Sequence, residues 1–152
     1  MPNKIHLRHI LEIGISIEER GKLFYEQLAV RAKNEKTKNL CLNIAKDELA
    51  HKEFIKSILD KWLPLEMDSA DFLELNKFID RFNIYRNPPA DTATEHEMIK
   101  YAIGEEYKTA EFYLSFESMF PESWKKMNLE RLVIEERAHA ELLSELYPAD
   151  KM

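Results

Sequence analysis

The segment Asp47-Glu48-Leu49-Ala50-His51 returns 88 positions later as Glu135-Glu136-Arg137-Ala138-His139, and this repeat decides how the chain is interpreted. The same offset places Glu18 on Glu106 and Phe24-Tyr25 on Phe112-Tyr113. Each half therefore contains a Glu, an aromatic pair six and seven residues later, and a Glu-x-x-His motif that begins thirty residues after the first Glu. Two copies of one polar pattern at a single offset indicate two equivalent halves.

The apolar residues around this repeat predict four long helices. From Ile10 to Leu28, apolar or small residues recur at alternating steps of three and four, which is the period of one helix face. We expect helices over residues 5–33 and 37–62. A third should open at Thr92-Ala93-Thr94-Glu95, which has the form of a capping box, and end near residue 119. A fourth should lie between Pro121 and Pro148. No segment alternates with a period of two, so no sheet is expected.

The connection between the two halves runs from residue 63 to residue 91. Pro64 should end the second helix, Asn87-Pro88-Pro89 should break any later one, and a short helix is expected from Asp68 to Phe82. This connection is long enough to run the length of a bundle. We therefore predict an all-α fold with one domain over residues 1–152, a four-helix bundle of two helical hairpins joined by a long crossover with a short helix.

Composition and charge exclude several classes of protein. Of 152 residues, 22 are Lys or Arg and 28 are Asp or Glu, and the net charge of −6 argues against a nucleic-acid partner. Charged residues interrupt every apolar stretch before it could span a bilayer, and the first residues lack a secretory signal. The single cysteine, Cys41, cannot form an internal disulfide or a four-cysteine site. We expect a soluble, cytoplasmic protein without a membrane partner.

Helix geometry predicts where the repeated polar residues lie. Residues three, four and seven apart share one helix face, and the neighbours of Glu106 and Glu136 on those faces are mainly apolar. Each Glu pair stands roughly fifteen residues, about 22 Å, from the turn of its hairpin, so the two pairs should lie level with each other. We expect six side chains to meet at mid-bundle: Glu18, Glu48, His51, Glu106, Glu136 and His139.

Four buried carboxylates at one level predict bound cations. Burial of unpaired charge costs several kcal/mol per ion, and no Lys or Arg recurs on these faces in both halves. Two divalent cations would neutralise the four carboxylates while both imidazoles stay neutral. Oxygen and imidazole ligands without thiolate suit iron or manganese, and ligand type leaves zinc open as well. We expect two metal ions, with iron as the first choice.

Several nearby residues are candidates for supporting roles. Asp47 and Glu135 stand four residues before each His and are expected to accept hydrogen bonds from imidazole N–H groups. Tyr25 and Tyr113 either donate hydrogen bonds to the carboxylates or are core aromatics with a polar tip. Thr109 lies one turn beyond Glu106 and faces the same site. No catalytic residue is expected beyond the metal ligands, and His6, His9 and His96 are expected to be solvated.

This pattern resembles the ferritin-like di-iron carboxylate proteins, in which two helices supply one Glu each and two supply a Glu-x-x-His motif. It is most similar to the rubrerythrin family over nearly the whole chain, in residues 17–25, 47–51, 105–113 and 135–139. The resemblance implies a ferritin-like fold and iron ligands at Glu18, Glu48, His51, Glu106, Glu136 and His139. It also implies that Glu48 and Glu136 bridge the two metals.

Two departures from that family affect the expected activity. Its classical members carry a four-cysteine rubredoxin module for electron delivery, and one cysteine cannot build it, so we expect an external electron donor. Their third helix also has a second Glu three residues after the ligand, which takes part in redox-dependent iron movement during peroxide reduction. That position is Thr109 here.

Three classes of function are compatible with this set of residues. The leading expectation is an oxidoreductase of the peroxidase or oxidase type, active in oxidative stress, that reduces hydrogen peroxide or dioxygen. The second is an iron-handling protein, either a ferroxidase, a store or a carrier. The third is a structural bundle with an empty or zinc-filled site. Hydroxylation of an organic substrate would need a roomy apolar pocket beside the metals. We expect a homodimer in each case.

Overall fold

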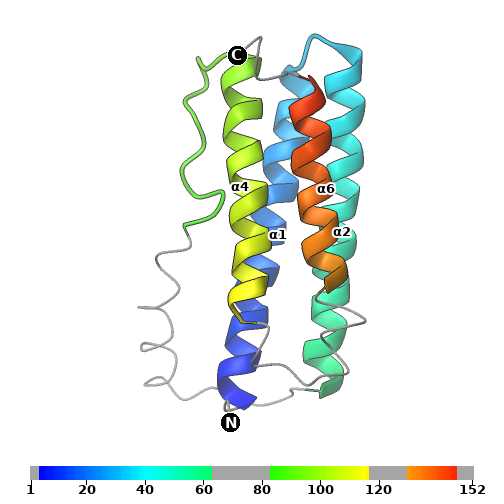
Figure 1. The fold of residues 1–152 in the computed structure, drawn as a ribbon, viewed down its shortest axis with the longest axis vertical. Helices are drawn as coiled ribbons and strands as arrows, with labels where there is room; N and C mark the ends of the chain where they lie inside the picture. The colour runs from blue at the N-terminus through cyan, green and yellow to red at the C-terminus, as the bar shows by residue number, and fades with distance from the viewer. Residues whose placement is uncertain (1–3, 63–82, 117–129, 147–152) are drawn as a thin grey trace.

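A computed structural model of the chain describes residues 4–62, 83–116 and 130–146. These residues form a bundle of the helices α1 (Lys4–Arg31), α2 (Glu35–Trp62), α4 (Glu95–Ser115) and α6 (Glu130–Leu146). Consecutive helices run antiparallel, so α1 and α2 make one hairpin and α4 and α6 the other (Figure 1). The described ranges contain no strand. The expected all-α bundle of two hairpins is confirmed.

The turn between α1 and α2 is set by polar residues. Asn34 precedes α2, and its side-chain oxygen accepts a hydrogen bond from the backbone N–H of Lys36 at 2.8 Å. This contact satisfies one of the N–H groups that a helix start leaves without a partner. Helix α1 ends at Arg31 and α2 begins at Glu35, each within two residues of the expected boundary.

The start of α4 differs from the expected one. The capping box is formed by Thr94 and Glu97, two residues later than the expected Thr92 and Glu95. Residues 90–93 instead form a turn closed by the Ala93 N–H on Ala90 O, and Arg31 donates hydrogen bonds to the carbonyls of Asp91 and Ala93. Because those carbonyls are bound to α1, the helix begins after them.

The crossover is described from residue 83 onward, where it runs beside α4 (Figure 1). Arg20 of α1 donates a hydrogen bond to the carbonyl of Ile84 at 3.0 Å. Side-chain contacts from α1 therefore hold both ends of residues 84–93 against the bundle. Helix α4 ends at Ser115, earlier than the expected end near residue 119, because Phe116 caps it and its N–H turns to the Tyr113 carbonyl at 3.3 Å. The expected short helix at residues 68–82 and the start of the fourth helix lie outside the described residues.

The core is mainly apolar, and most of its buried polar side chains lie at mid-bundle. Buried apolar side chains come from all four helices and from the crossover, including Ile17, Ile44, Ile84, Ile99 and Leu143. His9 is also buried, which corrects the expectation that it is solvated; Ile10 and Leu11 beside it are buried as well, so the bundle encloses α1 on more than one side here. In the described parts of the chain, no helix is long and apolar enough to cross a membrane.

Candidate metal centre

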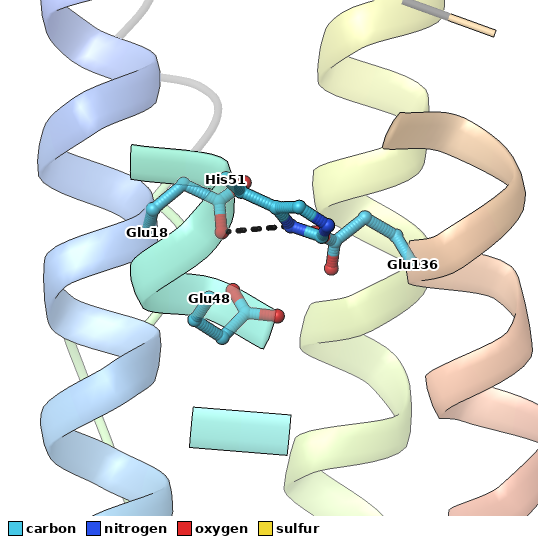
Figure 2. A group of neighbouring side chains, drawn as sticks. All are labelled: Glu18, Glu48, His51 and Glu136. Carbon is cyan, nitrogen blue, oxygen red and sulfur yellow. Dashed lines mark ion pairs between the residues drawn. The ribbon is translucent and has the colours of Figure 1, made fainter. Parts of the chain in front are cut away.

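Six polar side chains project into the middle of the bundle from all four helices. Helix α1 contributes Glu18, α2 contributes Glu48 and His51, α4 contributes Glu106, and α6 contributes Glu136 and His139. All four carboxylates are fully enclosed, and the two imidazoles are 4% and 3% exposed. Figure 2 shows Glu18, Glu48, His51 and Glu136 turned toward a common point between the helices. The structure thus brings together the six Glu and His residues of the repeat.

The six residues form two overlapping groups, each able to hold one metal ion. One atom from each of Glu18, Glu48, His51 and Glu136 lies within 4.8 Å of the others. The same holds for Glu48, Glu106, Glu136 and His139. We call these groups the His51 half-site and the His139 half-site. Glu48 and Glu136 belong to both, so the cluster fits a pair of metal ions with two shared carboxylates.

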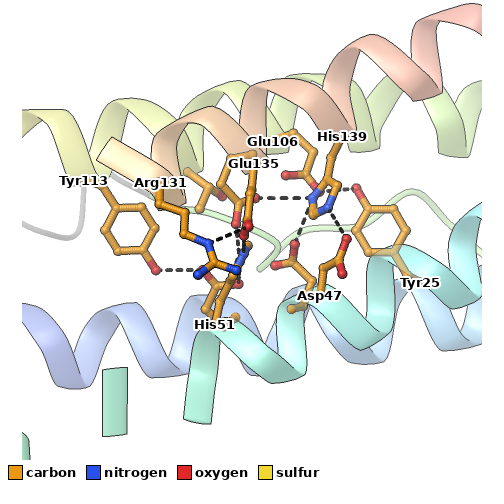
Figure 3. Close-up of polar contacts among 12 residues, drawn as sticks. Tyr25, Asp47, His51, Glu106, Tyr113, Arg131, Glu135 and His139 are labelled. Carbon is orange, nitrogen blue, oxygen red and sulfur yellow. Dashed lines mark hydrogen bonds and ion pairs between the residues drawn. The ribbon is translucent and has the colours of Figure 1, made fainter. Parts of the chain in front are cut away.

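Each imidazole is oriented by a carboxylate from the other hairpin. The His139 Nε2 atom lies 2.9 Å from Asp47 Oδ2, and His51 Nε2 contacts Glu135 Oε2 (Figure 3). Asp47 and Glu135 are thus acceptors as expected, but each pairs with the His across the interface between α2 and α6, not with the His of its own motif. With the proton on Nε2, the lone pair of Nδ1 faces the carboxylate cluster.

The tyrosines form a second pair of contacts between the hairpins. The Tyr25 hydroxyl donates to Glu106 Oε1 at 2.7 Å, and the Tyr113 hydroxyl donates to Glu18 Oε1 at the same distance. Figure 3 shows the two rings on opposite sides of the imidazoles. Of the two interpretations left open by the sequence, the structure supports hydrogen bonding to the carboxylates. These bonds hold the Oε1 atoms of Glu106 and Glu18 in place.

Burial and crowding shift the pKa values of the cluster. Burial raises the pKa of Glu48 and of Glu136 well above the ordinary value, and neighbouring carboxylates raise both further. Burial also raises the pKa of Glu18, but contacts with Glu48 and His51 outweigh it and lower the value. Without metal, these side chains cannot all carry their charge, so some protons are retained.

The imidazoles respond to the same carboxylates. Burial lowers the pKa of His51, but Glu136 and Glu18 outweigh this effect and raise it to about 12. For His139, burial is likewise outweighed by Glu106 and Glu136, and the pKa rises to about 11. In the metal-free protein, the imidazolium groups therefore supply positive charge that bound cations would otherwise provide. Protonation of carboxyl groups removes part of the negative charge.

Unsatisfied atoms test whether the residues suit a pair of cations. Eight buried atoms of the cluster have no hydrogen-bond partner among the described residues: Glu18 Oε2, both oxygens of Glu48 and of Glu136, Glu106 Oε2, and Nδ1 of His51 and His139. His51 Nδ1 lies 2.8 Å from Glu136 Oε1 without the alignment of a hydrogen bond. Buried polar atoms normally have partners. Because all eight are oxygen or imidazole nitrogen, the cluster fits two divalent metal ions.

Sequence reasoning missed two residues of the centre. Tyr85, in the crossover, is buried, and its hydroxyl lies 2.8 Å from the Tyr25 hydroxyl and 3.2 Å from Glu106 Oε1. Glu105 is 2% exposed and accepts the backbone N–H of Tyr85 at 2.8 Å. Tyr85 has no counterpart in the repeat, so no pattern pointed to it. For Glu105, the acidic doublet with Glu106, like those at residues 47–48 and 135–136, was an available signal.

Thr109 is fully buried one turn after Glu106, as its position in the helix predicts. Its hydroxyl donates to the backbone carbonyl of Glu105 at 2.8 Å. The hydrogen of this hydroxyl is therefore used within α4.

A cavity of about 280 Å³ opens between α2 and α6 next to the centre. Its lining includes His51 together with the three other ionisable residues Asp47, Arg131 and Glu135, and the remaining wall is formed by Ala50, Phe54 and Leu132. Arg131 also donates a hydrogen bond to Glu135 at 3.0 Å. The cavity thus reaches the imidazole of the His51 half-site through a polar opening.

Comparison with known proteins agrees with this geometry. No curated protein and no solved structure gave a significant match. The family model described as Rubrerythrin matches residues 9–147, a range that includes all six side chains of the centre and both hairpins. The paired Glu-x-x-His motifs, the antiparallel hairpins and this match lead to one conclusion: the chain belongs to the rubrerythrin family.

Proposed function

We propose that Glu18, Glu48, His51, Glu106, Glu136 and His139 hold two iron ions and that Glu48 and Glu136 bridge them. The observation that carries this proposal is the set of eight buried oxygen and nitrogen atoms without hydrogen-bond partners, arranged in two overlapping groups. Four carboxylates balance two divalent ions when both imidazoles are neutral. The contacts of Nε2 with Asp47 and Glu135 place the N–H of that neutral form on Nε2 and leave Nδ1 as the metal-binding atom.

The proposed reaction is the reduction of hydrogen peroxide or dioxygen with electrons from an external donor. Conversion of one hydrogen peroxide to two waters breaks the O–O bond and takes two electrons and two protons, and the electrons are what a bound ferrous pair supplies. Tyr25 orients the carboxylate of Glu106, and Tyr113 orients that of Glu18. The protein also encloses the reacting centre, because all four carboxylates are fully buried.

The cavity beside His51 supports a small polar oxidant over an organic substrate. Four of its seven lining residues are ionisable, whereas hydroxylation of an organic molecule would call for a larger apolar wall. A peroxide molecule can form hydrogen bonds with such a lining. This lining therefore supports reduction of a small oxidant over hydroxylation of an organic substrate.

The test begins with protein reconstituted with ferrous iron in the absence of oxygen. We expect two iron ions per chain, rapid oxidation by stoichiometric peroxide or dioxygen, and repeated turnover once a reductant is added. Glu48→Gln should lose iron binding, and Glu53→Gln, an exposed residue on the same helix, should behave as wild type. Iron accumulating well beyond two per chain would instead indicate storage, and a site that takes only zinc would indicate a structural role.

Three further expectations belong to this proposal. The chain should act as one domain over residues 1–152, as a homodimer, and in the cytoplasm in response to oxidative stress. Sedimentation of the reconstituted protein and its location in fractionated cells would test the last two.

A further inference from the structure

The two half-sites share most of their contacts. Tyr25 donates to Glu106 and Tyr113 donates to Glu18, both at 2.7 Å. Each imidazole likewise has a carboxylate partner on its Nε2 atom. With only these contacts, the His51 and His139 half-sites would be nearly equivalent and would bind the same kind of metal ion with similar affinity.

Tyr85 breaks this equivalence. Its hydroxyl lies 2.8 Å from the Tyr25 hydroxyl and 3.2 Å from Glu106 Oε1, so Glu106 is approached by two tyrosine hydroxyls. Among the described residues, Tyr113 is the one tyrosine that reaches Glu18. The crossover occurs once in the chain, and residue 85 has no partner at the repeat offset. The third tyrosine therefore belongs to the His139 half-site.

Gly21 in the first half of the repeat leaves room for the Tyr85 ring. A Cβ atom placed on Gly21 would lie 3.2 Å from the Tyr85 ring. The residue that corresponds to Gly21 in the second half is Thr109, which carries a side chain. Glycine at position 21 thus lets the ring approach α1, and the equivalent position on α4 is filled.

The backbone around Tyr85 is held in an uncommon conformation. Its φ angle is 57°, in the left-handed region that favours glycine. The Tyr85 N–H donates to Glu105 Oε1 at 2.8 Å, and Glu105 also pairs with Lys108 at 2.8 Å. Arg20 holds the preceding carbonyl. A strained residue persists where surrounding contacts over-determine it, and such positions are often functional.

The hydrogen bonds show what Tyr85 does for Glu106. Three oxygens, from Tyr85, Tyr25 and Glu106, lie in mutual contact and share two hydroxyl hydrogens. When Tyr25 donates to Glu106, Tyr85 donates either to Tyr25 or to Glu106 itself. A hydroxyl that accepts a hydrogen bond becomes a stronger donor. In both arrangements Glu106 Oε1 is held, which leaves Oε2, an atom without a hydrogen-bond partner, for a metal ion.

We propose that Tyr85 is a positioning residue that makes the two half-sites unequal, so that the His139 half-site binds a divalent metal ion more tightly than the His51 half-site. A carboxylate already held in its bound orientation loses less freedom on binding metal. Hydrogen-bond partners of metal ligands typically change metal affinity 10- to 100-fold when they are removed. This inference rests on the proposed metal centre and adds an order of filling to it.

The test measures each half-site separately, with divalent cobalt as the probe. His51→Ala leaves the His139 half-site, and His139→Ala leaves the His51 half-site. We expect the His51→Ala protein to bind cobalt more tightly than the His139→Ala protein, by calorimetry and by the visible absorption of bound cobalt. This comparison leaves Tyr85 intact and so does not depend on the folding of a Tyr85 variant.

Tyr85→Phe is then added to each background. It should weaken cobalt binding about tenfold in the His51→Ala protein and less than twofold in the His139→Ala protein. Tyr113→Phe, the matched control on Glu18, should show the opposite pattern, and the exposed Tyr107→Phe should change neither. Melting curves of the metal-free variants verify folding.

Three results would overturn the inference. Equal affinity of the two half-sites would exclude a filling order, and equal weakening by Tyr85→Phe in both backgrounds would assign it a structural role alone. No weakening in either background would remove Tyr85 from the centre. If wild type and all variants fail to bind cobalt or iron, the proposed metal centre itself is wrong, which is distinct from these results.

Discussion

Asp47 Oδ2 lies 2.9 Å from His139 Nε2, although the two residues belong to different hairpins and stand 92 positions apart in the chain. The carboxylate holds the proton on Nε2 and so directs Nδ1 toward the cluster. Its own motif contains His51, which contacts Glu135 instead. The support for each imidazole is therefore supplied by the opposite hairpin.

The pairing of each imidazole with a carboxylate from the opposite hairpin predicts which half-site Asp47 and Glu135 support. Asp47→Ala should weaken cobalt binding at the His139 half-site by about tenfold or more and leave the His51 half-site nearly unchanged. The measurement uses the His51→Ala and His139→Ala backgrounds. The exposed Asp60→Ala on the same helix is the control. Weakening confined to the His51 half-site would show that Asp47 acts within its own motif.

We predict two metal ions per chain. His51→Ala and His139→Ala should each lower the metal content toward one ion, because each removes the nitrogen of one half-site and leaves Glu48 and Glu136 in place. Elemental analysis after anaerobic loading with ferrous iron measures the ratio. Wild-type protein that stays metal-free under these conditions would contradict the prediction.

The stability of the metal-free protein should rise on mild acidification. The pKa values of His51 and His139 are raised to about 12 and about 11 in the folded protein. Their contribution to the free energy of unfolding is therefore fully present below the unfolded pKa of about 6.5 and is lost as pH rises toward the folded values. Glu48 and Glu136, whose pKa values are also raised, act in the same direction. The pKa of Glu18 is lowered instead, so its contribution to stability is lost as pH falls below its ordinary pKa of 4.5.

The metal-bound protein should show the opposite trend, because protons compete with metal for the same atoms. Melting curves from pH 8 to about pH 5.5, with and without bound metal, measure both. Identical pH dependence in the two forms would argue against a buried carboxylate cluster that binds metal.

Gly21→Ala should weaken metal binding. The new Cβ atom would lie 3.2 Å from both Glu48 Oε2 and the Tyr85 ring, so one of them has to shift. Alanine also favours the helix by about 0.5–1 kcal/mol, so the metal-free protein should lose little stability. Gly104→Ala is the matched control, since its Cβ would meet nothing within 4 Å. It should raise the melting temperature and leave metal affinity unchanged.

Thr109 is expected to set the choice of oxidant. A neutral hydroxyl that already donates to the Glu105 carbonyl cannot act as the second carboxylate found in classical rubrerythrins. We predict that wild type discriminates weakly between peroxide and dioxygen and that Thr109→Glu shifts the ratio of oxidation rates toward peroxide. Thr109→Val, which removes only the hydroxyl, should leave the ratio unchanged. A strong peroxide preference in wild type that Thr109→Glu does not alter would contradict this view.

The repeat predicted much of the bundle because helical spacing and equal distances from the turns determine where its members lie. Glu18 and Glu106, thirty residues before Glu48 and Glu136, meet them at mid-bundle for that reason. The same spacing could not assign partners across an interface. It placed Asp47 near its own motif, but the packing of α2 against α6 decides which imidazole it contacts.

Features outside the repeat were not predictable in this way. Tyr85 reaches Glu106 through a left-handed backbone conformation and a hydrogen bond to Glu105, and neither leaves a periodic signal. The start of α4 was placed two residues early because Thr92 and Thr94 both begin a capping-box pattern. The hydrogen bonds of Arg31 to the turn, which come from α1, select the second.

The contacts between the hairpins are reciprocal. Tyr25 donates a hydrogen bond to Glu106, and Tyr113 donates one to Glu18. In the same way, Asp47 contacts His139 and Glu135 contacts His51. Reciprocity of this kind is the mark of an isologous interface between two identical subunits. One hairpin in isolation would carry three of the six candidate ligands and would lack every side chain that orients them. Completing the centre and docking the hairpins are therefore a single event, as in a dimer whose active site forms only on assembly.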